Sequence, residues 1–130
     1  GHEMDETILP DEAALGWTVA LNPPDRAFIG RAPIEALRAR GLEKTVQGLI
    51  LEAKGVCRSG MSVVFSDGRQ GTVTSGGYSP VLGRGIALVR VPPDASAECA
   101  LIVRDRPLPA RLVLPPFVRR GKACLAVAPV

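Results

Sequence analysis

The side chains of this sequence that are best suited to binding chemistry are its arginines. A guanidinium group binds a carboxylate or a phosphate through paired, charge-assisted hydrogen bonds. The basic excess lies toward the C-terminal end, in two groups: Arg104, Arg106 and Arg111, then Arg119, Arg120 and Lys122. The formal net charge is only +3, so a solvated charged face is the simpler interpretation and a surface that binds an anion is the alternative.

The side chains that carry acid–base, nucleophilic or metal chemistry are sparse. The single histidine, His2, lies at the N-terminal end, so a Ser–His–Asp or Cys–His arrangement has no suitable base. Cys57, Cys99 and Cys124 are odd in number and form no CxxC pair, which disfavours a disulfide framework and a zinc site. We expect reduced, mostly buried thiols in a cytoplasmic protein, with no catalytic residue and no metal site in this chain.

The elements that must position these side chains are expected to be mostly β strands. The 14 glycines and 12 prolines exceed average usage and predict many turns between short strands. The Asp67-Gly68 pair predicts a hairpin turn. Apolar runs predict strands over residues 45–52, 61–65, 70–75, 85–91, 97–104 and 108–114. Their number and spacing are typical of a small antiparallel six-stranded barrel or jelly roll.

A short α/β connecting segment is expected to precede the barrel. Residues 17–21 are rich in β formers and predict a strand. Residues 32–40 predict a helix, and Gly41 suits the position after its last turn. Glu35 and Arg38 are spaced for an ion pair on the solvent side of this helix.

Membranes and nucleic acids are both disfavoured as partners. No run approaches the ~18 apolar residues of a membrane span, and the acidic residues 1–6 do not resemble a signal peptide. A barrel that binds single-stranded nucleic acid combines a basic groove with aromatic platforms. The aromatic residues do not alternate with basic ones along any predicted strand, and we expect most of them in the core: Trp17, Phe28, Phe65, Tyr78 and Phe117.

Six blocks of local sequence run in order along nearly the whole chain. The first three are Gly1-His2-Glu3-Met4-Asp5-Glu6-Thr7, then Pro10, Glu12 and Leu15-Gly16-Trp17-Thr18-Val19, then Asp25-Arg26 with Phe28-Ile29-Gly30-Arg31. The others are Gly55-Val56-Cys57-Arg58-Ser59-Gly60, then Gly71, Thr74-Ser75-Gly76, Ser79-Pro80, Leu82-Gly83 and Ile86-Ala87-Leu88, then Pro116-Phe117-Val118-Arg119 with Gly121-Lys122. In order and spacing these blocks resemble the aminomethyltransferase (T-protein) family of the glycine cleavage system.

The resemblance implies an enzyme that binds tetrahydrofolate in a cavity between three domains. Such an enzyme transfers a one-carbon unit from the aminomethyl-lipoyl arm of the H-protein, releases ammonia and forms 5,10-methylenetetrahydrofolate. The match covers only the C-terminal third: residues 1–44 are expected to be the end of the folate-binding second domain with a linker helix, residues 45–122 the β-barrel domain, and residues 123–130 a tail. The catalytic carboxylate is expected upstream of residue 1, so this chain is expected to close the folate cavity and to be inactive alone.

The resemblance also singles out five cations as candidates for binding folate. Arg58 lies between two glycines, in a loop that can aim its guanidinium at a carboxylate: the glutamate tail of folate, an acid of the H-protein, or an internal Asp. The other candidates are Arg26, Arg119, Arg120 and Lys122. A surface ion pair is the alternative for Arg26, and a frayed basic tail without strong structural signal is the alternative for residues 119–130.

Three positions near these cations are informative. Gly76 is expected either to adopt a positive φ or to pass close to another element. Gly77-Tyr78 replaces the Thr-Phe pair of the family, and Cys57 replaces a leucine. The extra glycine is expected to make its loop more flexible.

Two alternatives remain open. The same tail domain occurs in enzymes of the sarcosine and dimethylglycine dehydrogenase type, where folate captures formaldehyde. A free-standing basic β-barrel that binds nucleic acid is the other, and it predicts a steep loss of oligonucleotide binding with added salt.

Overall fold

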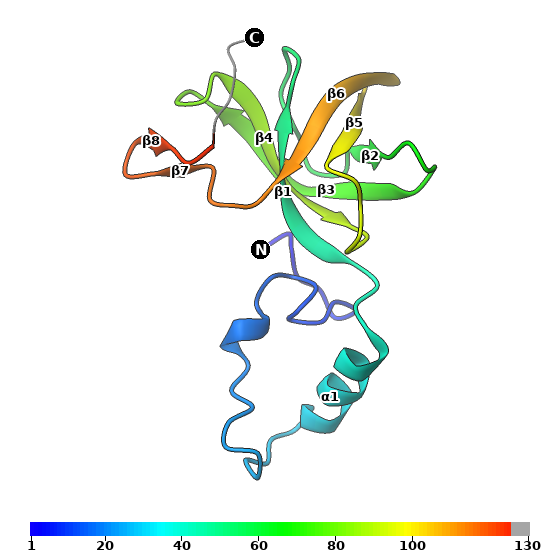
Figure 1. Cartoon of the computed structure of the whole chain (residues 1–130), viewed down its shortest axis with the longest axis vertical. Helices are drawn as coiled ribbons and strands as arrows, with labels where there is room; N and C mark the ends of the chain where they lie inside the picture. Colours follow the sequence, from blue (N-terminus) through cyan, green and yellow to red (C-terminus); the bar gives the residue numbers. More distant parts are fainter. Residues whose placement is uncertain (126–130) are drawn as a thin grey trace.

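The structure, a computed structural model, describes residues 1–125, and most of it is a closed barrel of six antiparallel strands (Figure 1). The strands follow the order β1-β4-β3-β2-β5-β6, and β6 pairs back with β1. Their bounds are β1 (Thr45–Leu51), β2 (Ser62–Val64), β3 (Gln70–Ser79), β4 (Arg84–Val91), β5 (Glu98–Val103) and β6 (Arg106–Val113). The predicted mostly β, six-stranded barrel is confirmed.

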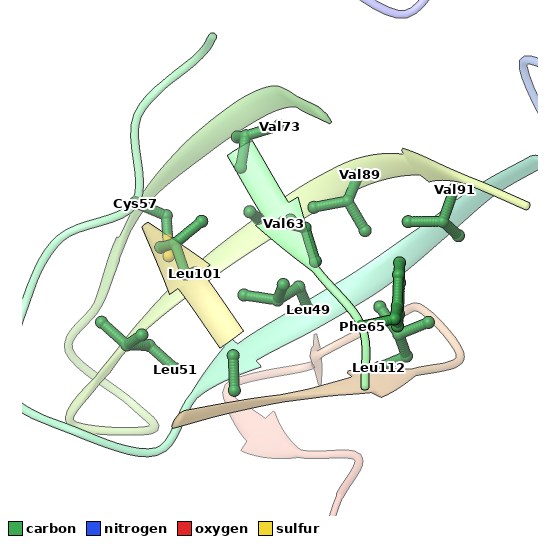
Figure 2. Packing of buried hydrophobic residues seen from close by; sticks show 12 residues of the cluster. Leu49, Leu51, Cys57, Val63, Phe65, Val73, Val89, Val91, Leu101 and Leu112 are labelled. Carbon is green, nitrogen blue, oxygen red and sulfur yellow. The ribbon is translucent and has the colours of Figure 1, made fainter. Parts of the chain in front are cut away.

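Alternating apolar side chains fill the barrel. In β4, every second residue from Gly85 to Val91 is buried, as expected for a strand with one face toward a core. Figure 2 shows Leu49, Val89 and Leu101, from three different strands, meeting in this interior. Each fully buried aliphatic side chain contributes about 1.5–3 kcal/mol relative to exposure, so the barrel supplies most of the hydrophobic stabilisation.

The third strand is longer than the sequence predicts. Gly76 and Gly77, which we expected in a loop, lie inside β3, and the strand continues to Ser79. Tyr78 pairs with Gly85 across the hairpin, so the β3–β4 turn covers only residues 80–83. Backbone pairing with β4 outweighs the local preference of two consecutive glycines for a loop.

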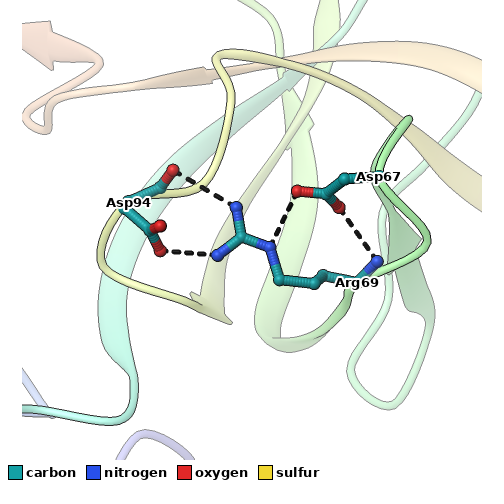
Figure 3. Close-up of polar contacts among 3 residues, drawn as sticks. All are labelled: Asp67, Arg69 and Asp94. Carbon is teal, nitrogen blue, oxygen red and sulfur yellow. Dashed lines mark hydrogen bonds and ion pairs between the residues drawn. The ribbon is translucent and has the colours of Figure 1, made fainter.

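One arginine connects two turns of the barrel (Figure 3). Arg69 Nε donates to Asp67 Oδ2 in the β2–β3 turn (2.8 Å), and Arg69 Nη1 donates to Asp94 Oδ1 in the β4–β5 turn (2.5 Å). These hydrogen bonds contribute to lowering the pKa of both carboxyls below the ordinary range. The Asp67-Gly68 turn predicted from the sequence is therefore present and is joined to a second turn.

The N-terminal 44 residues carry one helix and almost no core. The helix α1 (Arg31–Arg40) is confirmed and is followed by Gly41. The strand predicted over residues 17–21 is wrong: this segment holds the short 3₁₀ helix η1 (Gly16–Thr18), because no strand lies beside it to supply hydrogen bonds. From residue 16 to residue 44, no residue is buried.

The predicted ion pair between Glu35 and Arg38 is also wrong. Glu35 Oε1 instead accepts from Arg31 Nε, one helical turn earlier (2.9 Å). Arg38 binds Asp11, with Nη2 at 2.9 Å from Oδ1. The ion pair with Asp11 connects the helix to the preceding segment. Residue spacing within the helix does not reveal such a long-range partner.

A second small sheet follows the barrel. The strands β7 (Val118–Arg119) and β8 (Lys122–Ala123) form a two-residue hairpin through Arg120 and Gly121, with φ of 51° and 73°. Positive φ at both central residues is the requirement of a type I′ turn. The frayed tail expected from residue 119 is therefore wrong as far as residue 125, and the rest of that expectation lies outside the described residues.

Candidate anion-binding surface

Arg58 lies in the loop between β1 and β2. Its side chain is exposed, and within residues 1–125 no hydrogen bond or ion pair occupies its guanidinium. The neighbouring backbone is held on both sides: Met61 N donates to Arg58 O (3.3 Å), and Gly60 N donates to Val73 O of β3 (2.9 Å). Cys57, the residue before it, is completely buried. The loop therefore presents an exposed cation on a held backbone, and the internal Asp partner is not found in the part of the chain that is described.

Arg26 lies in the loop between η1 and α1, where a second arginine organises the backbone. Arg31 Nη1 donates to Arg26 O (2.8 Å) and to Pro23 O (3.4 Å). The Arg31 guanidinium also lies 6.0 Å from the centre of the Phe28 ring. The Arg26 side chain is exposed. Arg31 was missed as a positioning residue, although it stands in the same sequence block.

The remaining three candidate cations lie together on the β7–β8 hairpin. Arg119, Arg120 and Lys122 are all exposed, and the residues between 1 and 125 supply no carboxylate to any of them. The hairpin is fixed at its base, where Cys124 N donates to Phe117 O (2.9 Å). Three cations within four residues make this hairpin a local site of positive potential.

A mainly apolar groove of about 290 Å³ adjoins the hairpin. Phe117 forms one side of it, and the outer faces of β3 and β4 form the rest. Its lining residues are Ser75, Gly76, Gly77, Tyr78, Ile86, Ala87, Leu88 and Phe117. This volume lies at the lower end of the range of small-molecule pockets.

The five predicted cations do not form one cluster. In Figure 1 the segment between η1 and α1, which carries Arg26, lies at the end of the long axis that is far from the barrel, whereas the β7–β8 hairpin lies beside the barrel. Arg119, Arg120 and Lys122 share that hairpin. Arg58 is related to the groove through Gly76, because Gly76 both lines the groove and touches Cys57. The structure therefore groups three of the five cations, on the hairpin, whereas Arg58 and Arg26 lie on two other loops.

Two further arginines were missed in the sequence. Arg84, in β4, is buried, and its Nη1 donates to Leu51 O (3.4 Å) beside a pocket that includes Lys54 and Tyr78. Arg90, also in β4, donates from Nη2 to Glu3 O (2.6 Å). Both lie in an apolar-rich strand, where the strand pattern gives no signal of a buried charge.

The aromatic residues are more exposed than we expected. Phe65 is buried, but Trp17 is 84% exposed and Tyr78 is 54% exposed. Cys124 is exposed as well. Among the three thiols, Cys57 is buried and Cys99 is partly buried. Within residues 1–125 no group of three or more His, Cys, Asp or Glu side chains is placed to hold a metal ion. No helix in this part of the chain is long and apolar enough to cross a membrane.

Comparisons with known proteins agree with this architecture. Residues 44–119 match the model of the glycine cleavage T-protein C-terminal barrel domain. An aminomethyltransferase from Nitrosococcus oceani is 51% identical over 125 residues, which cover 96% of this chain and 33% of that relative. The crystal structure of glycine cleavage system aminomethyltransferase T from Bartonella henselae superposes with a TM-score of 0.80 at 24% identity, over 94% of this chain and 35% of that one.

The matches cover nearly all of this chain but only part of each relative. The chain spans about a third of the length of the relatives it matches, and the structural likeness shows the common fold. The family model covers more than half of the chain and coincides with the six-stranded barrel. The chain therefore belongs to the glycine cleavage T-protein C-terminal barrel domain family.

Proposed function

We propose that this chain is the C-terminal part of a tetrahydrofolate-dependent aminomethyltransferase of the glycine cleavage system. The observation that carries the proposal is the 51% identity to an aminomethyltransferase across 96% of the chain. The reaction transfers a one-carbon unit from the aminomethyl-lipoyl arm of the H-protein to tetrahydrofolate and releases ammonia. In it, this chain closes one side of the folate cavity.

The cations of the surface fit the carboxylates of this substrate. The glutamate tail of folate carries negative charge at neutral pH, and an exposed guanidinium binds such a group bidentately. Arg58 and the hairpin cations Arg119, Arg120 and Lys122 are available to an external anion, and Arg26 is a further candidate on the N-terminal segment. An acidic side chain of the H-protein is the other partner that the same cations suit.

The lack of buried residues in the N-terminal segment supports a division of the chain into domains. Residues 16–44 bury no side chain, and Ile29 is fully exposed. A segment of that composition gains too little hydrophobic energy to order itself, so it fits a role as the end of a second domain whose other elements lie elsewhere. We assign residues 1–44 to that end and its linker helix, residues 45–122 to the barrel domain and residues 123–130 to a tail.

We further propose that the catalytic carboxylate lies outside this chain, since the chain corresponds to only about a third of the aminomethyltransferase that it matches. The test is a fusion in which this chain follows the preceding residues of the Nitrosococcus oceani aminomethyltransferase. Ammonia release is measured with aminomethylated H-protein and tetrahydrofolate.

The expected result is turnover by the fusion and none by the 130-residue chain alone. The matched control is the Nitrosococcus oceani protein lacking its C-terminal third, which should also be inactive. Turnover by the isolated chain, or a folded fusion without turnover, would overturn the proposal.

A further inference from the structure

We propose that Gly76 and Gly85 are positioning residues that fix Arg58 through the backbone of Cys57. The inference rests on the proposed function, in which Arg58 binds a carboxylate of the substrate. It concerns how the barrel holds the backbone at Arg58 in place rather than which reaction takes place.

The first observation is the contact between the β1–β2 loop and β3. A Cβ atom on Gly76 would lie 2.8 Å from both the carbonyl carbon and the Cβ of Cys57, and 2.9 Å from its carbonyl oxygen. Non-bonded carbon atoms pack at about 3.5–4.0 Å, so any other residue would push the loop away. The backbone of Cys57 therefore rests directly on β3 because position 76 has no side chain.

The second observation is the same kind of contact with the neighbouring strand. A Cβ atom on Gly85 would lie 2.9 Å from the carbonyl oxygen of Gly55 and 3.2 Å from Cys57 Sγ. Gly85 pairs with Tyr78 in the β3–β4 ladder. The loop thus contacts two adjacent strands, β3 and β4, and the contact position in each strand is a glycine.

These contacts bear on Arg58 because it is the next residue along the chain. Cys57 is completely buried, whereas Arg58 is exposed. The Gly60 N–H bond to Val73 O holds the other side of the loop (2.9 Å). A cation on a backbone fixed at both sides loses less conformational freedom when it binds an anion, and binding is tighter for that reason.

Gly77 supplies a matched control. It is adjacent to Gly76 in β3, neither glycine adopts a left-handed φ, and a Cβ atom on Gly77 would meet nothing within 4 Å. Gly77→Ala therefore makes the same chemical change in the same strand without touching the loop.

The kinetic test uses the fusion with the Nitrosococcus oceani domains. Arg58→Ala is expected to raise KM for tetrahydrofolate about tenfold, since a charge-assisted hydrogen bond is lost. Gly76→Ala is expected to raise the same KM several-fold with kcat little changed, and Gly77→Ala to leave both unchanged. In the Arg58→Ala background, Gly76→Ala is expected to have no further effect, because its action passes through Arg58.

Several results would overturn the inference. One is an equal effect of Gly76→Ala and Gly77→Ala; another is a multiplied effect in the double variant. An unchanged KM in Arg58→Ala would remove the role of Arg58, and with it this inference, while a fusion that still turns over would leave the proposed activity standing.

A measurement that needs no substrate covers the case in which Gly76→Ala fails to fold. Backbone ¹⁵N relaxation of the 130-residue chain should give residues 56–60 order parameters near 0.85, as in rigid strands. Gly77→Ala should preserve these values, and Gly85→Ala should lower them. A native loop with order parameters below about 0.6 would contradict the inference whatever the variants do.

Discussion

Burial sets the chemistry of the thiols at the scale of single residues. Cys57 is enclosed by the barrel, and desolvation raises the pKa of its thiol to about 11. Burial, with a smaller contribution from the Glu52 carboxylate, raises the pKa of Cys99 to about 11 as well. Cys124 is exposed and lies directly after β8. The thiolate is the reactive form of cysteine, so the three sites differ in reactivity.

We predict that iodoacetamide at pH 8 labels Cys124 in the folded chain well before it labels Cys57. The physical reason is that Cys57 is both inaccessible and protonated at that pH. Peptide mass spectrometry of the alkylated chain gives the two rates. Labelling in denaturant is the control and should make the rates similar; fast labelling of Cys57 in the native chain would contradict its burial.

The same burial predicts a loss of stability at high pH. The folded pKa of Cys57 is about 11 and the ordinary value is 9.0, so between these values the unfolded chain has lost a proton that the folded chain keeps. The free energy of unfolding therefore falls as pH rises from 9 to 11. Urea unfolding across this range measures it, and Cys57→Ala should reduce the slope without abolishing it, because Cys99 contributes in the same direction.

At the scale of secondary-structure elements, the turn between β5 and β6 has an unusual backbone conformation. The β5–β6 hairpin turns through Arg104 and Asp105, which have φ of 50° and 63°. A non-glycine residue in this region costs about 1–2 kcal/mol. The strands predicted over residues 97–104 and 108–114 imply a connection here, but the sequence between them contains none of the Asn-Gly signals that usually mark a type I′ turn.

We predict that replacing Arg104 and Asp105 by Asn and Gly stabilises the chain by about 1 kcal/mol, because this pair suits the turn. The midpoint of thermal unfolding should rise. The matched control, Arg104→Lys with Asp105→Glu, keeps two side chains in the strained region and should leave the midpoint unchanged. A lower midpoint in the Asn-Gly variant would show that the side chains compensate for the strain.

Glu3 connects the irregular N-terminal segment, residues 1–9, to the barrel. Ser75 Oγ donates to Glu3 Oε1 (2.6 Å), and this hydrogen bond lowers the pKa of Glu3 below its ordinary 4.5. A lowered folded pKa means that the contact stabilises the chain above pH 4.5 and that its contribution disappears as pH falls through the folded value.

We therefore predict faster amide exchange in residues 1–9 as pH falls below about 4, after correction for the intrinsic rate. Glu3→Gln should give fast exchange already at pH 6. Glu6→Gln, which changes an exposed carboxyl on the same segment, should behave as the native chain does. Equal behaviour of the two variants would exclude the Ser75 contact as the cause.

The local sequence pattern predicted which helices and strands exist better than it predicted where they end and what they contact. Apolar runs between turn residues located all six barrel strands, and Gly41 located the end of α1. The strand expected over residues 17–21 failed because strand formation needs a neighbour that local sequence does not supply. Gly76 was expected either to turn or to approach another element, and only the structure shows the approach, since its partner Cys57 is 19 positions away and on another element.

The candidate site was less predictable than the fold. The sequence suggests five candidate cations, but their grouping depends on where the hairpin and the N-terminal segment lie in space. Arg31 and Arg84 act on backbone carbonyls of other segments, and no spacing rule reports such contacts. A resemblance to a family supplies candidate residues, whereas their mutual placement follows only from the packed chain.

At the scale of the whole molecule, the chain divides into a part with a core and a part without one. The barrel buries its apolar residues, while residues 16–44 leave Trp17 and Ile29 in solvent. Exposed apolar side chains on an extended segment commonly mark a surface that another element covers.

We predict that residues 16–44 exchange their amide hydrogens rapidly in the 130-residue chain and more slowly in the fusion with the Nitrosococcus oceani domains. Burial by the added domains is the physical reason. Hydrogen exchange read by mass spectrometry measures it, with barrel peptides from β1 and β4 as the internal control. Equal protection of residues 16–44 in both proteins would contradict their assignment to a second domain.

The order of the strands in the barrel also constrains how the chain acquires its structure. The first strand, β1, pairs with β4 and β6, so Leu49 lies opposite Ala87 and Leu112. Neither neighbour exists until some forty to sixty residues more have been synthesised, and contacts at such separation are slow to form because long loops must close first. On a ribosome, β1 therefore waits for β6 before the barrel closes, and any domain encoded earlier has time to fold first.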